Sequence, residues 1–296
     1  MPRSNPLISI YLPTRNRSAL LTRAVSSVLK QTIQDFELII VDDCSTDQTG
    51  DLCSTICKAD LRVRYYRTHQ RSGAPYARNL AIREAASPLV TGLDDDDEML
   101  PERLSSLLRH FKPTQSLLCS SAYEKNESWH RLVNAGEAVI DLDELLFDNI
   151  VGTQVITLKS RLEAIGGFDE TLTASQDYDV WVRLVEKYGP GKRIALPTYI
   201  INADNRSDRI TVSSKTYASQ FLSKHRRIMN PHQIASQEFY TIAARGDQLT
   251  FAEWAKVTNR RTWVKTTRYL ITSRLPWLRA IARVARRLRS SIGRPL

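Results

Sequence analysis

Short apolar segments that each end in a cluster of polar residues recur along the first third of the chain. Apolar residues dominate 7–12, 36–41 and 88–93, and helical patterns of apolar residues separate these segments. This alternation of strand and helix signals is typical of a parallel sheet flanked by helices. Because ligands bind beyond the carboxyl ends of the strands in open α/β sheets, the sequence predicts an α/β fold with a ligand site at that edge.

The residue pattern also predicts a type for each segment. We expect strands at 7–12, 36–41, 63–66, 88–93 and 117–121, helices from Ser18 as N-cap, through Leu52 and Ile56, from Gly73 and from Pro101, and an amphipathic helix over 176–188. The last helix carries Asp177 and Asp179 near its N-terminal end, where the helix dipole favours a carboxylate that stays ionised. A capping or dipole-compensating role is the alternative for both acids.

Four consecutive aspartates, at 94–97, follow the third of the apolar segments. Like charges this close repel one another, so the cluster needs a counter-charge unless water solvates it. Mg²⁺ and Mn²⁺ prefer oxygen ligands, and Mg²⁺ typically uses one or two carboxylates together with substrate phosphates. A solvated acidic turn is the alternative, since charge runs are usually surface features. Polar clusters at 13–16 and 42–43 end two other strands, which favours one ligand shared by three strand ends.

The chain lacks the glycine-rich loops that bind phosphates in many nucleotide enzymes. No G-x-G-x-x-G or Walker-type sequence occurs, and only 11 residues are glycine. A nucleotide at this edge would therefore be held by a metal ion and side chains. This pattern argues against dehydrogenases and P-loop enzymes.

Cysteine usage and hydropathy indicate a reduced, cytosolic protein. Cys44, Cys53, Cys57 and Cys119 form no disulfide framework, and no second pair is placed to complete a zinc site. The N-terminal segment has no long apolar core of a signal peptide, and no run of 18 apolar residues occurs. We therefore do not expect a membrane-spanning helix.

Positive charge is concentrated at the C-terminal end. Residues 254–296 contain twelve of the 42 Lys and Arg and none of the 32 Asp and Glu. On a helical wheel, residues 276–292 place Trp277 and the aliphatic residues on one arc and five arginines elsewhere. Such a helix binds anionic membrane surfaces. A helix docked on the domain is the alternative, and nucleic acid is not expected because no binding motif is present.

Six motifs are together more specific than any one of them. They are Pro13-Thr14-Arg15-Asn16-Arg17, Val41-Asp42-Asp43-Cys44-Ser45, Ala77-Arg78-Asn79, Leu93-Asp94-Asp95-Asp96-Asp97, Gly166-Gly167-Phe168-Asp169 and Gln176-Asp177-Tyr178-Asp179-Val180-Trp181. In this order they resemble the inverting family 2 glycosyltransferases of GT-A fold, over roughly residues 5–215. The resemblance implies a Rossmann-like, mixed and mostly parallel sheet flanked by helices. We expect a transferase domain at 1–230, with a nucleotide-sugar half at 1–115 and an acceptor half at 116–230, and a helical basic tail at 231–296.

The resemblance also implies roles for particular residues. Asp177 would be the catalytic base and Asp96 the ligand of Mn²⁺ or Mg²⁺, while Gly167 and Trp181 would shape the acceptor pocket. The nucleotide-sugar site would comprise Pro13, Thr14, Arg15, Asp43, Arg78, Asp94 and Asp95. Many relatives have Glu where this chain has Gln176, and some have a histidine near the diphosphate that 199–204 lacks.

The implied function is transfer of a sugar from a nucleotide-sugar donor, with a UDP-sugar expected, to a hydroxyl group of a glycan or lipid-linked acceptor. Segments 149–155 and 174–179 look most like bacterial enzymes that glucosylate the lipopolysaccharide outer core. We therefore expect a hexosyltransferase that is peripheral on the inner face of the cytoplasmic membrane. One alternative is an idle domain of the same fold that binds a membrane or a glycan. The other is a sugar nucleotidyltransferase, which would have a Gly-rich, Lys-bearing loop in place of 13–17.

Overall fold

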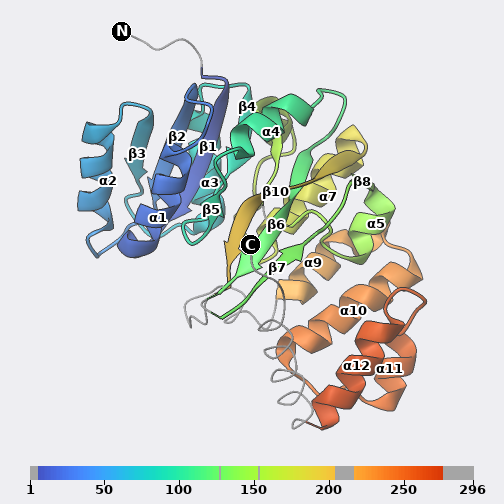
Figure 1. The fold of residues 1–296 in the computed structure, drawn as a ribbon. Coiled ribbons are helices and arrows are strands. Elements are labelled where there is room, and N and C mark those ends of the chain that lie inside the picture. The colour runs from blue at the N-terminus through green and yellow to red at the C-terminus, as the bar shows by residue number, and fades with distance from the viewer. Residues whose placement is uncertain (1–5, 127, 153, 204–216, 276–296) are drawn as a thin grey trace.

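A ten-stranded sheet with helices on both faces forms the body of the protein (Figure 1). The structure is a computed structural model and describes residues 6–126, 128–152, 154–203 and 217–275. The strands are β1 Ile8–Thr14, β2 Phe36–Asp42, β3 Val63–Arg67, β4 Leu89–Gly92, β5 Glu98–Met99, β6 Leu118–Lys125, β7 His130–Val133, β8 Ala138–Ile140, β9 Ile156–Leu158 and β10 Gly191–Asn202. The helices are α1 Ser18–Leu29, α2 Thr49–Ala59, α3 Ala74–Glu84, α4 Arg103–His110, α5 Leu142–Phe147, α6 Lys159–Ala164, α7 Gln176–Tyr188, α9 Tyr217–His225, α10 Pro231–Arg245, α11 Phe251–Val257 and α12 Trp263–Arg274, with a 3₁₀ turn η1 at Arg226–Ile228.

The strands lie in the order β3-β2-β1-β4-β9-β6-β10-β5, with β7 paired to β6 and β8 to β10. The first four strands in this order are all parallel. The sheet becomes mixed at β9, which runs antiparallel to both β4 and β6, whereas β10 runs parallel to β6. The predicted fold class is therefore confirmed: a mixed α/β sheet with a parallel N-terminal part and flanking helices.

The central strands are apolar on both faces because helices cover both sides of the sheet. Every residue of β1 and β2 is buried. Ile8, Ile10 and Leu12 belong to a core cluster with apolar residues of α1 and α4. Tyr11 belongs to a second cluster, on the opposite face, with residues of α3 and α7. This two-sided burial leaves little room for polar side chains within the strands, where the exceptions include the hydrogen-bonded pair Ser9 and Glu37.

Most of the expected elements are confirmed, and two boundaries are wrong. The helix expected over 176–188 is α7, and Gly189 ends it with a left-handed φ of 82°. Ser18 is the first residue of α1 and not its N-cap, a position that Arg17 occupies without a side-chain cap. Helix α4 begins at Arg103, two residues after Pro101, because the amide of Arg103 closes a turn onto the carbonyl of Leu100.

The C-terminal helices pack around a small apolar cluster of their own. Phe239, Leu249, Val257 and Leu270 are buried together there. Helix α10 begins at Pro231, and a capping box between Asn230 and Gln233 satisfies its first amides. Helices α10–α12 lie at the lower end of the molecule in Figure 1, towards which β1 and β10 run. The amphipathic pattern noted at 276–292 falls outside the described residues.

Within the described part of the chain, no helix has both the length and the apolar character needed to cross a bilayer. All four cysteines are free thiols, as predicted.

Gly92, the last residue of β4, is required by close packing. A Cβ at this position would lie 1.9 Å from Oε1 of Gln154 and 2.4 Å from a ring carbon of Tyr11. We expect Gly92→Ala to lower the free energy of unfolding by about 1–3 kcal/mol, because an overpacked core must shift its side chains. Urea unfolding monitored by circular dichroism measures this change.

Gly50→Ala is the matched control, since the nearest atom to a Cβ there is 3.4 Å away and the residue lies in α2. This variant should be as stable as the wild type or more stable, because alanine favours helix. Equal stability of Gly92→Ala and the wild type would contradict the packing described at the end of β4.

Candidate active site

The guanidinium of Arg78 connects the aspartate run after β4 with the N-terminal end of α7. Its Nη2 donates to Oδ1 of Asp94 at 2.9 Å, and its Nη1 donates to Oε1 of Gln176 at 3.0 Å. Nη1 also lies 3.7 Å from Oδ1 of Asp177, as an ion pair. Arg78 projects from α3, is 7% exposed and stacks against the ring of Phe168. One buried cation therefore faces two carboxylates from different parts of the chain.

Burial alone would lower the pKa of Arg78, but the carboxylates of Asp177 and Asp94 raise it above its ordinary value. The arginine therefore stays charged. A buried charge is tolerated when it is paired and hydrogen-bonded, which is the arrangement here.

Asp177 lies in the first turn of α7, as expected, but its pKa shifts in the opposite direction from the predicted one. Burial raises the pKa to about 6; Arg78 acts against this shift, whereas Asp94 adds to it. Burial therefore outweighs the stabilisation that a position in the first turn of a helix offers an ionised carboxylate. Oδ1 of Asp177 is buried and accepts no hydrogen bond, while the side chain as a whole is 24% exposed. The carboxylate therefore has capacity to accept a proton.

Asp179, on the same helix, differs from Asp177 because its carboxylate is paired with several neighbouring side chains. It is fully buried and pairs with Arg183 at 2.6 Å, Lys224 at 2.8 Å and the Nε2 of His225 at 2.9 Å. Burial raises its pKa, but the bonds to His225, Arg183 and Lys224 outweigh burial and lower the pKa overall. Asp179 therefore has a structural role, because it holds α9 and α7 together.

Both carboxylate oxygens of Asp94 are bound by protein donors. Oδ1 accepts from Arg78, and Oδ2 accepts from Nε2 of Gln154 at 3.1 Å. The amide of Gln154 is itself oriented by the hydroxyl of Tyr11, which donates to its Oε1 at 3.2 Å. Asp94 is therefore held in one orientation beside the base candidate Asp177.

Asp95 ties the aspartate run to the loop after β1. Its carboxylate accepts from the hydroxyl of Thr14 and from Nη1 of Arg17, both at 2.8 Å. Burial raises its pKa to about 6, Arg17 lowers it, and the neighbouring Asp96 raises it. Burial is therefore the main reason for the raised pKa of Asp95.

Asp96 lies beside Arg17, with 3.6 Å between its Oδ2 and Nη1 of that arginine, and its side chain is 14% exposed. The next residue, Asp97, is buried and accepts the amide of Asn202 at 3.0 Å; burial, Asp96 and Asp94 together raise its pKa. Among the residues that the structure describes, no group of three or more His, Cys, Asp or Glu is arranged to hold a metal ion. A site of one or two carboxylates completed by substrate phosphates is the arrangement that Mg²⁺ and Mn²⁺ commonly use.

Asp43 has a structural contact at the site. Its Oδ1 accepts the amide of Ser72 at 2.6 Å, and its Oδ2 accepts the amide of Gly73 at 2.9 Å. Gly73 has a φ of 90° and begins α3. Asp43 therefore positions the helix that carries Arg78, whatever further contact it makes with a nucleotide.

The loops after β1 and β2 are joined to each other. Asn16, in the left-handed region with a φ of 52°, accepts the amide of Thr46 at 2.7 Å and donates its own amide to Ser45. Pro13 and Thr14 are buried at the end of β1. Nε of Arg15 is buried without a hydrogen-bond partner. The predicted nucleotide residues thus meet at one edge of the sheet, as their positions at strand ends suggested.

The two predicted acceptor residues differ in position. Trp181 is fully buried and packs edge-to-face on Phe168 at 6.4 Å, so in this structure it cannot contact a ligand directly. Gly167 has a φ of 69°, and a Cβ there would lie 2.4 Å from Oδ1 of Asn79. Trp181 therefore supports Phe168, on which Arg78 stacks, whereas Gly167 is partly exposed and packs closely against Asn79.

Sequence reasoning missed the polar residues that orient the aspartate run. Gln154 positions Asp94, Arg17 contacts Asp95 and Asp96, and Asn202 contacts Asp97 and the carbonyl of Asp96. Gln154 belongs to the 149–155 segment and Arg17 to the 13–17 motif. The motifs that carry the resemblance contain Arg17, and the 149–155 segment contains Gln154, but no role was assigned to either residue.

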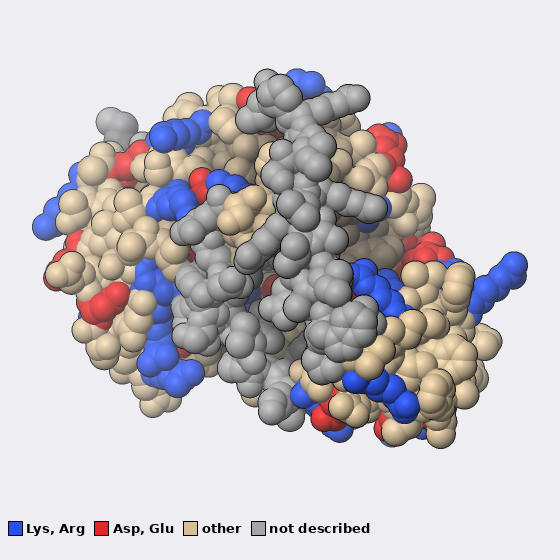
Figure 2. All heavy atoms as spheres, turned by 60° about the horizontal axis from the view of Figure 1, so that its bottom comes forward, with Lys and Arg blue, Asp and Glu red and all other residues tan. Residues whose placement is uncertain are grey.

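Lys and Arg side chains lie on both sides of the middle of the face seen in Figure 2.

The fold and this edge of the sheet define an α/β enzyme of the GT-A type. S. aureus TarS (residues 1–349) has a similar structure, with a TM-score of 0.60, 18% identity and coverage of 90% of this chain and 80% of TarS. The mannosyltransferase PcManGT from Pyrobaculum calidifontis, in complex with GDP-Man and Mn²⁺, gives a TM-score of 0.58 at 16% identity and covers 93% of this chain and 87% of its own.

Sequence comparison gives the family. Residues 9–162, just over half of the chain, match "Glycosyl transferase family 2". The glycosyl transferase WcaA of Escherichia coli (strain K12), whose name assigns it provisionally to colanic acid biosynthesis, is 37% identical over 227 residues, which are 74% of this chain and 80% of WcaA. TuaG of Bacillus subtilis (strain 168), named provisionally for teichuronic acid biosynthesis, is 28% identical over 226 residues, 73% of this chain and 88% of TuaG. The chain belongs to glycosyl transferase family 2, and it is a glycosyltransferase.

The raised pKa of Asp177 has a consequence for stability. The folded protein binds the proton of this carboxyl more tightly than the unfolded chain does, so ionisation lowers stability as pH rises from about 4 to 6. We expect Asp177→Asn to unfold at pH 7 with a free energy equal to the wild type or higher by about 1 kcal/mol, since the side chain is partly exposed. The advantage should vanish at pH 4, and urea unfolding at both values measures it.

Asp179→Asn is the matched control on the same helix. Its pKa is lowered, so its contribution is present at neutral pH and is lost as pH falls through the lowered value. We expect it to lose about 3–5 kcal/mol at pH 7, because it leaves Arg183, Lys224 and His225 without their buried partner. A comparable loss in Asp177→Asn would mean that Asp177 is a structural ion-pair partner.

Proposed function

We propose that the chain transfers a hexose, with glucose the first candidate, from a UDP-sugar to a hydroxyl group of a lipid-linked bacterial glycan such as the lipopolysaccharide core, with inversion at the anomeric carbon. The observation that carries this proposal is the pair of carboxylates around Arg78: Asp94 has both oxygens bound, whereas Oδ1 of Asp177 accepts no hydrogen bond. One carboxylate is thus positioned by the protein, and the other is available to the substrate.

Asp177 is the general base in this proposal. A hydroxyl group is a poor nucleophile, and a carboxylate that takes its proton during attack contributes about 10²–10⁴-fold. The best base has a pKa near the working pH, and burial raises that of Asp177 to about 6. Attack from the face opposite the leaving group needs no covalent enzyme intermediate, so no second nucleophile is required.

The donor side is assigned to the strand ends. Pro13, Thr14, Arg15, Asp43, Arg78, Asp94 and Asp95 bind the nucleotide sugar in this proposal, and Asp96 holds Mn²⁺ or Mg²⁺. A divalent cation supplies positive charge for the departing diphosphate. Support comes from the TarS structure in complex with UDP-GlcNAc and from the PcManGT structure with GDP-Man and Mn²⁺, which share the fold.

The acceptor side and the location rest on other observations. We assign the nucleotide sugar to 1–115, the acceptor to 116–230 and a membrane-associating role to 231–296, in which 254–296 contact anionic lipid. The names of WcaA and TuaG point to bacterial polysaccharide synthesis, which agrees with an acceptor carried on a lipid. A peripheral position on the inner face of the cytoplasmic membrane would bring enzyme and acceptor together.

A donor screen tests this function. The wild type, incubated with UDP-, GDP- and dTDP-sugars and Mn²⁺, should release UDP from one sugar donor. Asp177→Asn should bind UDP as tightly as the wild type, yet lose transfer by about 10²–10⁴-fold. In the wild type, kcat/KM should fall as pH drops through about 6, because the base becomes protonated. Near-native turnover by Asp177→Asn would refute the assignment of the base, and no release from any donor would favour an idle domain.

Metal removal gives an independent prediction. Excess chelator should abolish transfer, and added Mn²⁺ or Mg²⁺ should restore it, since a divalent cation stabilises the negative charge of a departing diphosphate. Asp96→Asn should raise the Mn²⁺ concentration needed for half-maximal activity by at least about tenfold. Asp51→Asn, which removes an exposed acid of α2, is the control and should leave this concentration unchanged. Full activity in excess chelator would contradict the metal site.

A further inference from the structure

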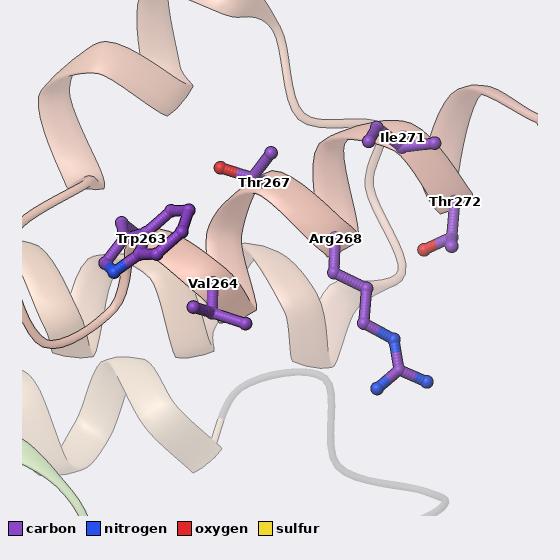
Figure 3. Close-up of a pocket in the computed structure, with 6 residues that line it drawn as sticks. All are labelled: Trp263, Val264, Thr267, Arg268, Ile271 and Thr272. Atoms are coloured by element: carbon purple, nitrogen blue, oxygen red, sulfur yellow. The ribbon is translucent and has the colours of Figure 1, made fainter.

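Helix α12 has an exposed apolar face that the fold does not use. Trp263 is 58% exposed, Val264 57% and Ile271 46%. With Thr267, Arg268 and Thr272, they line a shallow pocket along one side of the helix (Figure 3). The side of α12 that faces the other C-terminal helices is formed instead by Thr266, Leu270 and Ser273, which are buried. The exposed face is therefore not part of the apolar core of α10–α12.

The cations around this face fall into two groups. Arg261 pairs with Glu144, Lys265 pairs with Asp148 at 2.7 Å, and Lys256 pairs with Glu238 at 3.2 Å. The first two pairs join the start of α12 to α5 and the residue after it, so these cations fasten the helices to the rest of the protein. Arg274 donates to the carbonyl of Leu249 at 3.2 Å, within the C-terminal helices.

Arg260 and Arg268 form the second group. Neither makes an ion pair or a hydrogen bond with another residue in the part of the chain that the structure describes. Arg268 extends from the same side of α12 as Val264 and Thr272 (Figure 3). No acidic residue occurs anywhere in 254–296, so nothing along this segment neutralises the two charges. An exposed tryptophan, aliphatic side chains and the unpaired Arg268 thus share one surface, and Arg260 is exposed in the turn that precedes α12.

We propose that this face of α12, the α12 face, is the surface with which the enzyme contacts an anionic lipid bilayer. The inference rests on the proposed membrane location and assigns it to particular residues. Trp263, Val264 and Ile271 would enter the interface, where tryptophan is favoured, and Arg260 and Arg268 would meet the lipid phosphates.

The positive charge of the α12 face favours an anionic lipid surface, and not a second copy of the chain, as the partner that covers this face. In a two-fold dimer the same patch meets itself, so Arg268 of each copy would be buried near its equivalent without an acid to pair with. The position of α12 also agrees with a lipid contact. Helices α10–α12 lie at the lower end of the molecule in Figure 1, and β1 also runs downwards, so a bilayer at α12 would lie nearer the carboxyl end of β1 than its amino end.

Vesicle binding by the full chain tests the assignment. The wild type should cosediment with vesicles of equal parts phosphatidylglycerol and phosphatidylcholine, and less with phosphatidylcholine alone. The apolar double variant Trp263→Gln/Ile271→Gln and the charge double variant Arg260→Gln/Arg268→Gln should each bind the anionic vesicles at least about tenfold more weakly. Leu132→Gln/Val139→Gln is the matched control, because it removes two exposed apolar side chains, 47% and 64% exposed, from β7 and β8; it should bind like the wild type.

Donor hydrolysis in solution separates this inference from the proposed function. Both α12 variants should hydrolyse the donor at the wild-type rate without vesicles, because they leave the strand ends intact. Vesicle binding that is unchanged in both variants would overturn the assignment and place the contact elsewhere in the chain. A wild type that ignores anionic vesicles but forms a dimer that Trp263→Gln/Ile271→Gln breaks would overturn it in favour of a second copy.

Discussion

The guanidinium of Arg78, shared between Asp94 and Asp177, is the interaction on which the site depends. It joins the end of β4 to the start of α7, two segments that are far apart in the sequence and belong to the two expected halves of the transferase domain. Removing Arg78 would leave both carboxylates without the cation between them, and such a loss of a buried partner typically costs about 3–5 kcal/mol. Arg78 also prevents two buried carboxylates from facing each other without a cation. The same group therefore keeps the fold intact at the edge and allows Asp177 to ionise near neutral pH.

The sheet explains why these groups meet. Parallel strands covered by helices on both faces have little room for polar side chains except at their ends, so the loops after β1, β2 and β4 collect them. Several of these residues first serve the structure. Asp43 holds the amides that begin α3, Asp95 binds Thr14 at the end of β1, and Gln154 fixes the orientation of Asp94. The chemistry assigned to Asp177 uses the carboxylate whose Oδ1 accepts no hydrogen bond.

Periodicity and turn residues were enough to predict most of the fold. Local sequence is enough to show the apolar runs of β1 and β2 and the amphipathic pattern of α7. It is also enough to predict that 13–16, 42–43 and 94–97 share one edge of the sheet. The features that the sequence did not predict depend on tertiary packing. The helix dipole is a local property and predicted an easily ionised Asp177, whereas burial by distant segments raises its pKa. Trp181 could not be placed in the core from its motif, and Gln154 could not be assigned to Asp94 because 60 residues separate them. Neither burial nor long-range hydrogen bonding can be read from spacing.

The most direct measurement is a crystal structure of the enzyme with UDP and Mn²⁺. The account predicts manganese bound by Asp96, the diphosphate completing its coordination, the nucleotide between the loops after β1 and β2, and the exposed part of the Asp177 carboxylate facing an open acceptor site. A structure in which the manganese lies away from residues 94–97, or in which the nucleotide binds at another edge of the sheet, would contradict it.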